Sequence, residues 1–534
     1  MSRDQPLHEH LRRHARERPD APAIVWYGRA ISWRELDGWS DALGAHLQAL
    51  GVAQGEPVAL FMNNCPQYLL AHYAIQKIGA VVCPCGPLNK AHELQYQLDD
   101  LQARVIVAAD GLLPIVNQVR AQTALQHVLA VRYTDLLPPA PAIDLPAELQ
   151  TAPAPLPADC TDMLQIAQQG AQAGQAPAAP NTTMNDIALM TYTSGTTGLP
   201  KGAMLSFGNA LFKTTVTAQS AGIGPQHVAL SVAPLYHIAG MLMGVNVPIL
   251  VGAAQVLLLR FDPVAVLQAI DRYRVTHWYS IAPMNVACMQ VADVVRYDLK
   301  SLQRNPVTSF GITFTEALAA QWQAFTQGPC ISCEAAYGLS ETHTMDTGMP
   351  HDAIRWGTHG QPMPGVAIRI VDADTGAEKP AGEVGEITVR SPGNFKGYWR
   401  KPEATAATLR GGWVWTGDQG KLDAEGYLTF IGRTKEMIKV SGYSVFPEEV
   451  EAILIKHPAI AQAAVLAEAD DEKGEVVKAF VVTKPGAELT AHDLIAWSRD
   501  NMATYKVPKY VEFIDALPTT GAGKVLRRLL KADV

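Results

Sequence analysis

Residues 191–204 read TYTSGTTGLPKGAM, a stretch that directly follows the apolar run Ile187–Met190. Ten of its fourteen residues are Gly, Ser, Thr, Lys or Pro. Most clusters of this kind are solvated surface loops. The alternative is a phosphate-binding loop, because glycines let backbone N–H groups approach an anion and hydroxyls donate hydrogen bonds to it. The rest of the sequence has to decide between these two interpretations.

The spacing of the stretch excludes the common nucleotide signature G-x-x-x-x-G-K-[ST]. Gly195 and Gly198 are too close together, and Lys201 is followed by Gly202 where the signature needs Ser or Thr. The means of binding phosphate are nevertheless present, since Lys201 can neutralise negative charge or fix the loop. The hydroxyl donors of the loop are Thr193, Ser194, Thr196 and Thr197.

Length and composition indicate a globular protein of several domains. A chain of 534 residues is too long for one hydrophobic core, so at least two domains are expected. Hydrophobic residues make up 48% and charged residues 18%, which argues against disorder. The net charge of −8 gives no support to a nucleic-acid partner, which usually requires a basic surplus.

The seven cysteines are too sparse, and odd in number, for a disulfide framework. Cys330 and Cys333 form a C-x-x-C, and Cys83 and Cys85 form a C-x-C, so a four-thiolate zinc site can be imagined. Neither pair has the spaced second pair or the glycine knuckles of a zinc ribbon. We therefore favour small buried cysteines and expect no zinc.

One uncharged stretch, Ile238–Leu259, is long enough on paper to cross a bilayer. Asn246, Pro248 and Gly252 interrupt it, and we expect a buried helix, a turn at Gly252 and a strand over Gln255–Leu259. The polar N-terminus lacks the apolar core of a signal peptide. These features favour a soluble, cytoplasmic protein without a transmembrane segment over a membrane channel or transporter.

Residues 31–105 alternate between helical and strand patterns, which predicts a parallel sheet covered by helices. In the Pro- and Ala-rich tract Leu137–Pro180 we expect a long surface excursion with one short helix near Met163–Gln169. The expected elements before the tract are a helix over Trp33–Leu50, a strand over Pro57–Met62, a helix over Gln67–Ile78 and a strand over Ala80–Cys83. Those after it are strands over Val228–Val232, Val256–Leu259 and His277–Ile281 and helices over Met241–Leu250 and Pro263–Tyr273.

From about Gly365 the sequence pattern changes to short strands separated by glycine-rich turns. This pattern suggests an antiparallel region at the end of the large domain. A second boundary is expected near Gly432. Beyond it lies a unit of about a hundred residues, the size of a small domain. Its first helix is predicted to begin at Phe446-Pro447-Glu448-Glu449, because proline suits the first helical position and acids suit the N-terminal end of the dipole.

The stretch TSGTTGLPKG resembles the signature loop of the adenylate-forming (AMP-binding) enzymes, which include acyl-CoA synthetases, luciferases and peptide-synthetase adenylation domains. Further motifs of this family follow in its fixed order, so the resemblance spans nearly the whole chain. They are APLYHIAG at 233–240, AAYGLSET at 335–342, GEITVRSP at 385–392, WTGDQG at 415–420, GRTKEMIKVSGYSVFPEEVE at 432–451 and TTGAGKVLRR at 519–528.

The resemblance implies an α/β fold with two domains. Residues 1–432 would form a large N-terminal domain of stacked α/β sheets plus a β-barrel-like region. Residues 433–534 would form a small, mobile α+β domain. The family's small domain pivots at the position of Lys435 between two half-reactions, and one orientation presents Ser441, Gly442 and Tyr443 to the tunnel of the attacking thiol.

The resemblance also implies the nucleotide site. Glu341 would hold Mg²⁺, Tyr337 would stack on adenine, and Asp418 and Arg433 would bind the ribose. Lys524 would enter the site and steady the carboxylate oxygen and the α-phosphate. The family usually has Thr at Ser340, so the hydroxyl that touches the α-phosphate is kept. The full implied set comprises Thr193, Ser194, Gly195, Thr196, Thr197, Gly198, Lys201, Tyr337, Gly338, Ser340, Asp418 and Arg433 for the nucleotide, with Lys524, Glu341 and Thr193 as catalytic residues.

The acyl pocket would be bordered by the motif APLYHIAG. Amino-acid-activating domains carry Asp in this motif to pair with the substrate's ammonium group, and this chain has none, which favours a hydrophobic, uncharged acid. The family often has a Gly-Gly-Ala-Pro run where this chain has bulkier residues, which leaves the acyl-chain length open. The pocket residues inferred from the resemblance are His237, Met241, Gly311, Ile312 and Thr313.

The resemblance therefore implies an ATP-dependent acyl-CoA synthetase. A medium- or long-chain fatty acid would react with ATP to give acyl-AMP and pyrophosphate, and coenzyme A would then displace AMP. The substrates and cofactors would be ATP, Mg²⁺ and coenzyme A. Alternatives are a ligase that loads a separate carrier protein, an aryl- or alicyclic-acid CoA ligase, and an ATP-binding regulatory module without turnover. The sequence is compatible with a homodimer.

Overall fold

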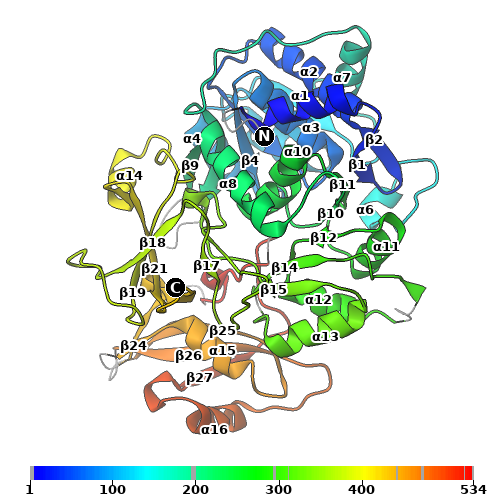
Figure 1. Cartoon of the computed structure of the whole chain (residues 1–534). Coiled ribbons are helices and arrows are strands. Elements are labelled where there is room, and N and C mark those ends of the chain that lie inside the picture. Colours follow the sequence, from blue (N-terminus) through cyan, green and yellow to red (C-terminus); the bar gives the residue numbers. More distant parts are fainter. Residues whose placement is uncertain are drawn as a thin grey trace.

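The computed structural model describes residues 5–193, 200–292, 296–310, 312–440, 443–470, 474–521 and 523–531. Its larger part contains two mainly parallel sheets with helices packed around them (Figure 1). One sheet has the order β7-β6-β5-β3-β4-β8-β9, in which β9 alone is known to run antiparallel to its neighbour. Its strands are β3 (Pro57–Phe61), β4 (Val81–Cys85), β5 (Val105–Ala109), β6 (His127–Val131), β7 (Thr161–Asp162), β8 (Ile187–Thr193) and β9 (Lys201–Ser206).

The other sheet has the order β13-β14-β12-β10-β11-β1-β2, with β15 beside β14. Its pairs are parallel except for the hairpin β1–β2. The parallel sheets predicted from the β-α-β alternation are thus confirmed. The strands are β1 (Pro22–Trp26), β2 (Arg29–Ser32), β10 (Val228–Ser231), β11 (Ala254–Leu257), β12 (His277–Trp278), β13 (Ser280–Ile281), β14 (Arg304–Thr308) and β15 (Ile331–Glu334).

Helices cover these sheets and begin where their sequences favour it. Ser32 caps the N-terminus of α2 by accepting from the Glu35 N–H, and Ser206 does the same for α8 through Asn209. The helix α3 is buried along its whole length. The helices are α1 (Leu7–Glu17), α2 (Trp33–Ala49), α3 (Pro66–Lys77), α4 (Ala91–Leu101), α5 (Leu113–Arg120), α8 (Phe207–Ala221), α11 (Pro263–Tyr273), α12 (Ala282–Met289) and α13 (Glu316–Thr326).

The Pro- and Ala-rich tract is not only a surface excursion, which corrects the expectation from its composition. It contributes the edge strand β7, the short helix α6 (Ala147–Gln150) and the helix α7 (Met163–Gln172). Met163, Leu164 and Ala167 of α7 are buried against the core. The apolar residues of α7 recur at helical spacing, so they form one face of the helix that packs on α2. This packing buries them even though the flanking segments are irregular.

The uncharged stretch 238–259 is a buried helix followed by a strand, as expected. It consists of α9 (Ile238–Met241), a π-helical segment η2 (Leu242–Asn246), α10 (Val247–Val251) and then β11. Gly252 ends the helix with a left-handed φ of 77°. Within the described part of the chain, we find no helix of the length and apolar character needed to span a membrane.

An antiparallel region follows the second sheet, as the pattern of short strands and glycine-rich turns predicts. Its sheet has the order β18-β19-β21-β20, with β22 beside β21, and the register places Asp418 opposite Arg433. The elements are η4 (Ser340–Thr342), β16 (Thr347–Gly348), β17 (Gln361–Pro362), β18 (Ala367–Val371), β19 (Gly385–Arg390), α14 (Pro402–Thr408), β20 (Leu409–Arg410), β21 (Trp413–Leu422) and β22 (Leu428–Arg433).

The C-terminal part has its own small sheet and core, below the larger part in Figure 1. The Phe446 N–H donates to the Glu449 carboxylate at 3.0 Å, and Pro447 opens the helix α15 as predicted. The elements are η5 (Thr434–Glu436), β23 (Ile438–Val440), β24 (Tyr443–Val445), α15 (Pro447–Leu454), β25 (Ile460–Asp470), β26 (Gly474–Thr483), α16 (Ala491–Asn501), β27 (Tyr510–Phe513) and η7 (Arg527–Leu529).

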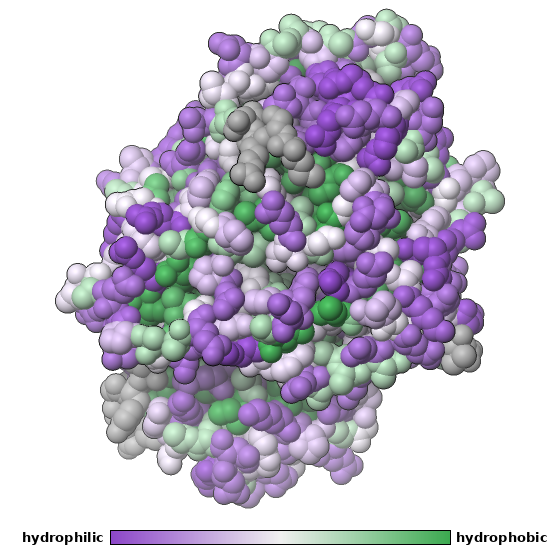
Figure 2. Space-filling model, in the orientation of Figure 1, coloured by the Kyte–Doolittle hydropathy of each residue, from purple (hydrophilic) through white to green (hydrophobic). Residues whose placement is uncertain are grey.

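The two parts meet where the last segment of the chain runs back toward the larger part (Figure 1). On the face drawn in Figure 2, hydrophilic residues gather over the region of α1 and α2, and hydrophobic residues lie in smaller areas between polar ones. The large N-terminal and smaller C-terminal parts confirm the expected fold class, with an antiparallel sheet where a barrel-like region was expected.

Candidate active site

The opening stretch connects the antiparallel strands β8 and β9. Thr193 and Lys201 are directly paired, and the Thr193 hydroxyl lies 3.5 Å from the Lys201 carbonyl oxygen. Ser194, Gly195, Thr196, Thr197 and Gly198 lie outside the described residues. The helix α4 holds both ends of this connection, because the Tyr192 hydroxyl donates to Asp100 at 2.6 Å and the Tyr96 hydroxyl donates to the Pro200 carbonyl at 2.8 Å.

Tyr398 connects this hairpin to Glu341. The Lys201 Nζ lies 4.5 Å from the centre of the Tyr398 ring, a cation–π distance. The Tyr398 hydroxyl donates to Glu341 Oε1 at 2.7 Å, and the Phe395 N–H donates to the Glu341 carbonyl at 2.7 Å. Glu341 is therefore held through its side chain and its backbone beside the hairpin that carries the glycine-rich loop.

Tyr337, Asp418 and Arg433 form a connected group. The Tyr337 hydroxyl donates to Asp418 Oδ2 at 2.8 Å, and its ring stacks on Phe430 with centroids 6.0 Å apart. Arg433 Nε lies 3.3 Å from Asp418 Oδ1. Burial raises the pKa of Asp418, and the Arg433 charge opposes this. Asp418 Oδ1 is buried, and among the described residues no donor, the nearby Arg433 Nε included, is aligned to hydrogen-bond it, so it can accept a hydrogen bond from a ligand hydroxyl.

Gly338 and Ser340 lie between Tyr337 and Glu341 in a tight turn. A Cβ on Gly338 would stand 2.6 Å from the Met345 backbone nitrogen, so only glycine fits there. Ser340 begins the short helix η4, which also contains Glu341. The turn thus brings the expected adenine, α-phosphate and magnesium residues to one edge of the second sheet.

Lys524 reaches this group from the end of the chain. Its loop is closed by Thr520, whose N–H donates to the Lys524 carbonyl at 2.7 Å and whose hydroxyl accepts from the Lys524 N–H at 3.1 Å. Burial and the Arg433 charge lower the pKa of Lys524, while Glu436 and Asp418 oppose the shift. Burial and the Lys524 charge lower the pKa of His237 to about 4. Lys524 therefore lies within electrostatic range of both the Asp418–Arg433 pair and His237.

The loop of Lys524 approaches the large domain so closely that its glycines have no room for side chains. A Cβ on Gly521 would stand 2.1 Å from the Tyr236 hydroxyl, and one on Gly523 would stand 2.6 Å from Ile281 Cδ1. Gly523 also has a left-handed φ of 85°. These contacts tie the loop to the APLYHIAG segment and to the strand β13.

We expect Gly521→Ala to displace Lys524 and to slow acyl-adenylate formation about tenfold or more, because small misplacements of a reacting group are costly. Thioester formation from supplied acyl-AMP should change little. Tyr236→Phe removes the hydroxyl that the new methyl group meets, so the double variant should recover part of the lost rate. Rapid-quench measurement of the two half-reactions tests this, and a double variant no faster than Gly521→Ala would contradict the steric explanation.

A small cavity lies between His237 and the second sheet. It has a volume of about 20 Å³, which is room for little more than one water molecule. Among the described residues, its lining is largely apolar and carries no charged side chain, since the low pKa keeps His237 neutral near pH 7. The lining residues are Ala233, Pro234, His237, Ala239, Gly240, Tyr279, Ser280, Ile281, Met284 and Phe310.

The remaining residues of the expected pocket and hinge lie in different places. Met241 is buried one turn after His237, Ile312 packs beside Phe314, and Thr313 is exposed, so none of the three lines this cavity. Lys435 lies in η5, two residues after Arg433. Tyr443 begins β24. Gly311, Ser441 and Gly442 lie outside the described residues.

Sequence reasoning missed the residues that support the site from other elements. Tyr398 bonds Glu341, Asp100 and Tyr96 hold the ends of the glycine-rich loop, and Phe310 lines the cavity. The only signal for Tyr398 is an aromatic pair after Gly397. None of these residue types is distinctive in a sequence, so only their contacts in the fold show what they support.

Comparisons with known proteins place the chain in a family. A family model for the AMP-binding enzyme matches residues 11–399, and one for the AMP-binding enzyme C-terminal domain matches residues 449–524. The long-chain-fatty-acid–CoA ligase of Bacillus subtilis is 33% identical over 534 residues, covering 96% of this chain and 91% of the relative. The feruloyl-CoA synthase of an Amycolatopsis species is 34% identical over 531 residues, covering 98% of both.

Solved structures agree with the family and the fold. The anthranilate CoA ligase AuaEII in complex with anthranoyl-AMP superposes with a TM-score of 0.86 at 27% identity, covering 99% of this chain and 97% of that one. The ATP-bound MatB of Rhodopseudomonas palustris gives a TM-score of 0.84 at 26% identity, covering 99% and 98%. The chain belongs to the AMP-binding enzyme family, and it is an AMP-forming acid–thiol ligase that uses ATP.

Proposed function

We propose that the protein activates a hydrophobic carboxylic acid, most readily a medium- or long-chain fatty acid, and transfers it to coenzyme A. The observation that carries the proposal is the position of Lys524, whose charge acts on both the Asp418–Arg433 pair and the cavity residue His237. The Lys524 ammonium group would lie between the proposed nucleotide site and the apolar cavity. In this position it can contact both the carboxylate of the acid and the α-phosphate of ATP as they react.

The proposed first half-reaction is attack of the acid's carboxylate on the α-phosphate of ATP, which gives acyl-AMP and pyrophosphate. Tyr337 would stack on adenine, Asp418 and Arg433 would bind the ribose hydroxyls, and Thr193, Ser340, Lys201 and the loop between β8 and β9 would bind the phosphates. Lys524 would stabilise the negative charge shared by the carboxylate and the α-phosphate. These residues act by position and charge, so the reaction needs no side-chain nucleophile.

Glu341 fits the proposed magnesium site. Its carboxylate is a hard oxygen donor, and its Oε1 is oriented by the Tyr398 hydroxyl. When bound there, the ion would neutralise charge on the phosphates of ATP. Glu341 would hold it, and Tyr398 would keep the carboxylate directed at it.

The second half-reaction is proposed to follow a rotation of the C-terminal domain. The domains would comprise residues 1–432 and 433–534 and would turn about Lys435, which stands between β22 and the small sheet. The turn would withdraw Lys524 and bring Ser441, Gly442 and Tyr443 to the thiol's tunnel, where coenzyme A displaces AMP. The proposed setting is the cytoplasm, where ATP and coenzyme A are available.

The acid is proposed to be apolar because no charged side chain lines the cavity. Fatty acids are favoured by the long-chain-fatty-acid–CoA ligases among the relatives. An aryl acid is the second candidate, because Tyr279 and Phe310 face the cavity and because a feruloyl-CoA synthase and an anthranilate CoA ligase are similar to this chain. Either acid requires side chains to move, since the cavity holds about 20 Å³.

Acid-dependent exchange of pyrophosphate into ATP tests this function. We expect exchange with fatty acids of eight to sixteen carbons, tested beside benzoate, cinnamate, ferulate and cyclohexanecarboxylate at matched concentrations. AMP release with coenzyme A should exceed release with a phosphopantetheinylated carrier protein. Exchange with aryl acids alone would establish the second candidate, preference for the carrier would establish a carrier-loading ligase, and no exchange with any acid would overturn the proposal.

A further inference from the structure

The segment from Tyr337 to Thr347 forms a closed loop that carries Glu341. The N–H groups of Asp346 and Thr347 both point at the Tyr337 carbonyl, at 2.8 and 3.3 Å, and the Tyr337 N–H donates to the Thr347 hydroxyl at 2.8 Å. Tyr337 stands at one end of the loop, and Glu341 lies near its tip in η4. Whatever fixes the returning half of the loop therefore also fixes Glu341.

The returning half has an unfavourable backbone. His343, Thr344 and Met345 follow η4 with φ values of 59°, 56° and 50°, so three successive non-glycine residues are left-handed. Side chains crowd the carbonyl oxygens in this conformation, and runs of it are rare. Such a run persists only where surrounding contacts hold it in place.

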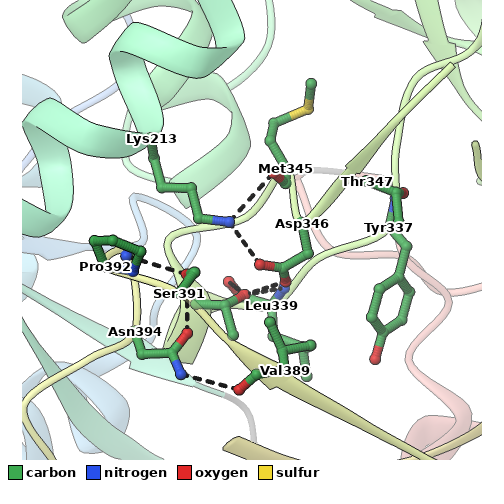
Figure 3. Close-up of polar contacts among 12 residues, drawn as sticks. Lys213, Tyr337, Leu339, Met345, Asp346, Thr347, Val389, Ser391, Pro392 and Asn394 are labelled. Carbon is green, nitrogen blue, oxygen red and sulfur yellow. Dashed lines mark hydrogen bonds and ion pairs between the residues drawn. The ribbon is translucent and has the colours of Figure 1, made fainter. Parts of the chain in front are cut away.

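Lys213 of α8 supplies those contacts. Its Nζ lies 2.5 Å from Asp346 Oδ1 and 3.2 Å from the Met345 carbonyl oxygen (Figure 3). Neither side chain of the Lys213–Asp346 pair is exposed to solvent. The other carboxylate oxygen of Asp346 accepts from the Thr342 hydroxyl, which stands beside Glu341. Lys213 thus binds both Met345, the last left-handed residue, and the Asp346 carboxylate, which in turn hydrogen-bonds Thr342 of η4.

The aliphatic part of the Lys213 side chain also packs on a second segment that holds Glu341, the turn around Gly393 that leads to Phe395 and Tyr398. A Cβ on Gly393 would stand 2.4 Å from Lys213 Cε, so the lysine lies directly against this glycine. Gly393 belongs to the turn around Ser391 and Asn394, which Figure 3 shows beside the lysine. The same chain continues into Phe395 and Tyr398, which hydrogen-bond the backbone and the carboxylate of Glu341.

We propose that Lys213 and Asp346 are positioning residues that fix the Glu341 carboxylate in the orientation needed to hold Mg²⁺ with ATP. The inference rests on the adenylation proposed above. The pair lies apart from the residues proposed to bind nucleotide and acid; it acts through the Met345 carbonyl, the Thr342 hydroxyl and the Gly393 turn. None of the motifs that carry the family resemblance contains either residue, so this buried pair adds support that the motifs do not describe.

The alternative is that the pair only stabilises the fold. A buried lysine elsewhere provides the matched control. The side chain of Lys77 in α3 is fully buried, and its Nζ lies 2.5 Å from Oδ1 of Asp37 in α2. Removing one partner of a buried pair leaves an uncompensated charge and destabilises strongly. Both charges are therefore removed together, in Lys213→Met/Asp346→Asn and in Lys77→Met/Asp37→Asn. Asp41, which also lies 2.9 Å from Lys77 Nζ, keeps the Arg12 guanidinium 3.0 Å from its Oδ1 in the second variant.

The main readout is binding, measured by calorimetry with the non-reactive analogue α,β-methylene-ATP in the presence and absence of Mg²⁺. AMP serves as a probe of the adenine and ribose site, and thermal midpoints report stability. We expect Lys213→Met/Asp346→Asn to bind AMP as the wild type does. Its gain in analogue affinity from Mg²⁺ should fall about tenfold or more, with a matching fall in kcat for pyrophosphate exchange. The Lys77 double variant should lose thermal stability and keep the full gain from Mg²⁺.

Equal, unchanged gains from Mg²⁺ in both double variants would overturn the positioning role. If the Lys213 double variant does not fold, Asp346→Glu decides, because it keeps the charge and moves the carboxylate by one methylene; a full gain from Mg²⁺ in this variant would equally overturn the role. The proposed function fails separately, if the wild-type protein shows neither Mg²⁺-dependent analogue binding nor exchange with any acid. That result would remove this inference with it.

Discussion

Lys524→Ala is expected to slow acyl-adenylate formation about a hundredfold or more, the loss typical when one preorganised charge donor is removed. The charge of Lys524 lowers the pKa of His237 and opposes the rise in the pKa of Asp418, so the lysine lies between the sites proposed for the acid and for the nucleotide. No other ammonium group comes from its loop in the described residues 519–521 and 523–525. Burst measurements of pyrophosphate release give the rate of this half-reaction.

Thioester formation from supplied acyl-AMP is the internal comparison, and it should change less than about threefold because the lysine is proposed to leave the site first. Lys484→Ala, at an exposed position of the same small domain, is the control for a lost surface charge. Equal losses in both half-reactions would count against the assigned role.

The pH dependence gives a second check on Lys524. The cation is the proposed active form, and burial and the Arg433 charge hold the pKa of Lys524 below the ordinary 10.5. Wild-type adenylation should therefore decline on the alkaline side before free lysine titrates, and the residual activity of Lys524→Ala should lack this decline. A decline shared by both proteins would assign it to another group.

Acidification from pH 6.5 to pH 4 is expected to unfold the protein. Among the described residues, eight histidines have strongly lowered pKa values, and burial is the largest cause for each. They are His8 and His72, at about 3, and His10, His14, His237, His277, His343 and His359, at about 4. An unfolded histidine takes up its proton near pH 6.5, so unfolding binds protons below that pH and stability falls.

The size of the effect follows from linkage. Each fully buried histidine that stays neutral in the fold costs about 1.4 kcal/mol for every pH unit between 6.5 and its folded pKa. Several together exceed the roughly 5–15 kcal/mol by which proteins are usually stable. Buried carboxyls oppose the loss, because Glu334 and Glu448 have pKa values raised to about 7 and take up protons in the fold between pH 7 and 4.5. Burial also raises the pKa values of Asp135, Asp346, Glu386, Asp418 and Glu451, which act in the same direction. The eight strongly shifted histidines outnumber these seven carboxyls, so the expected net change is a loss.

Circular dichroism against pH and temperature tests this prediction. His359→Asn keeps an acceptor for the Phe430 N–H and removes one ionisable ring, so its stability should fall less steeply with acid than that of the wild type. His492→Gln, whose side chain is 93% exposed, should leave the slope unchanged. A thermal midpoint that stays constant from pH 7 to pH 4.5 would show that the buried histidines do not control acid stability.

Much of the fold could be predicted from local patterns. The helix Pro263–Tyr273 has its predicted bounds, because proline at the start and a regular apolar stripe act within a few residues. The strand predicted over Pro57–Met62 is observed over Pro57–Phe61. In the tract 137–180 the short helix expected near Met163–Gln169 is confirmed as Met163–Gln172. Its burial against the core is not predicted, because the composition of the tract is that of a loop and the burial of Met163 and Leu164 depends on contact with α2, far away in sequence.

The sequence by itself determined the family, the order of the elements and the residue types of the proposed nucleotide site, because these follow from contiguous motifs whose chemistry is local. Only the tertiary structure showed that Tyr398 bonds Glu341, that Lys524 lies near His237, and that Lys213 and Asp346 form a buried pair. The residues in each of these contacts are separated by between 57 and 287 positions in the sequence. Lysine, tyrosine and aspartate are common surface residues, and only burial among specific partners makes such groups interact strongly.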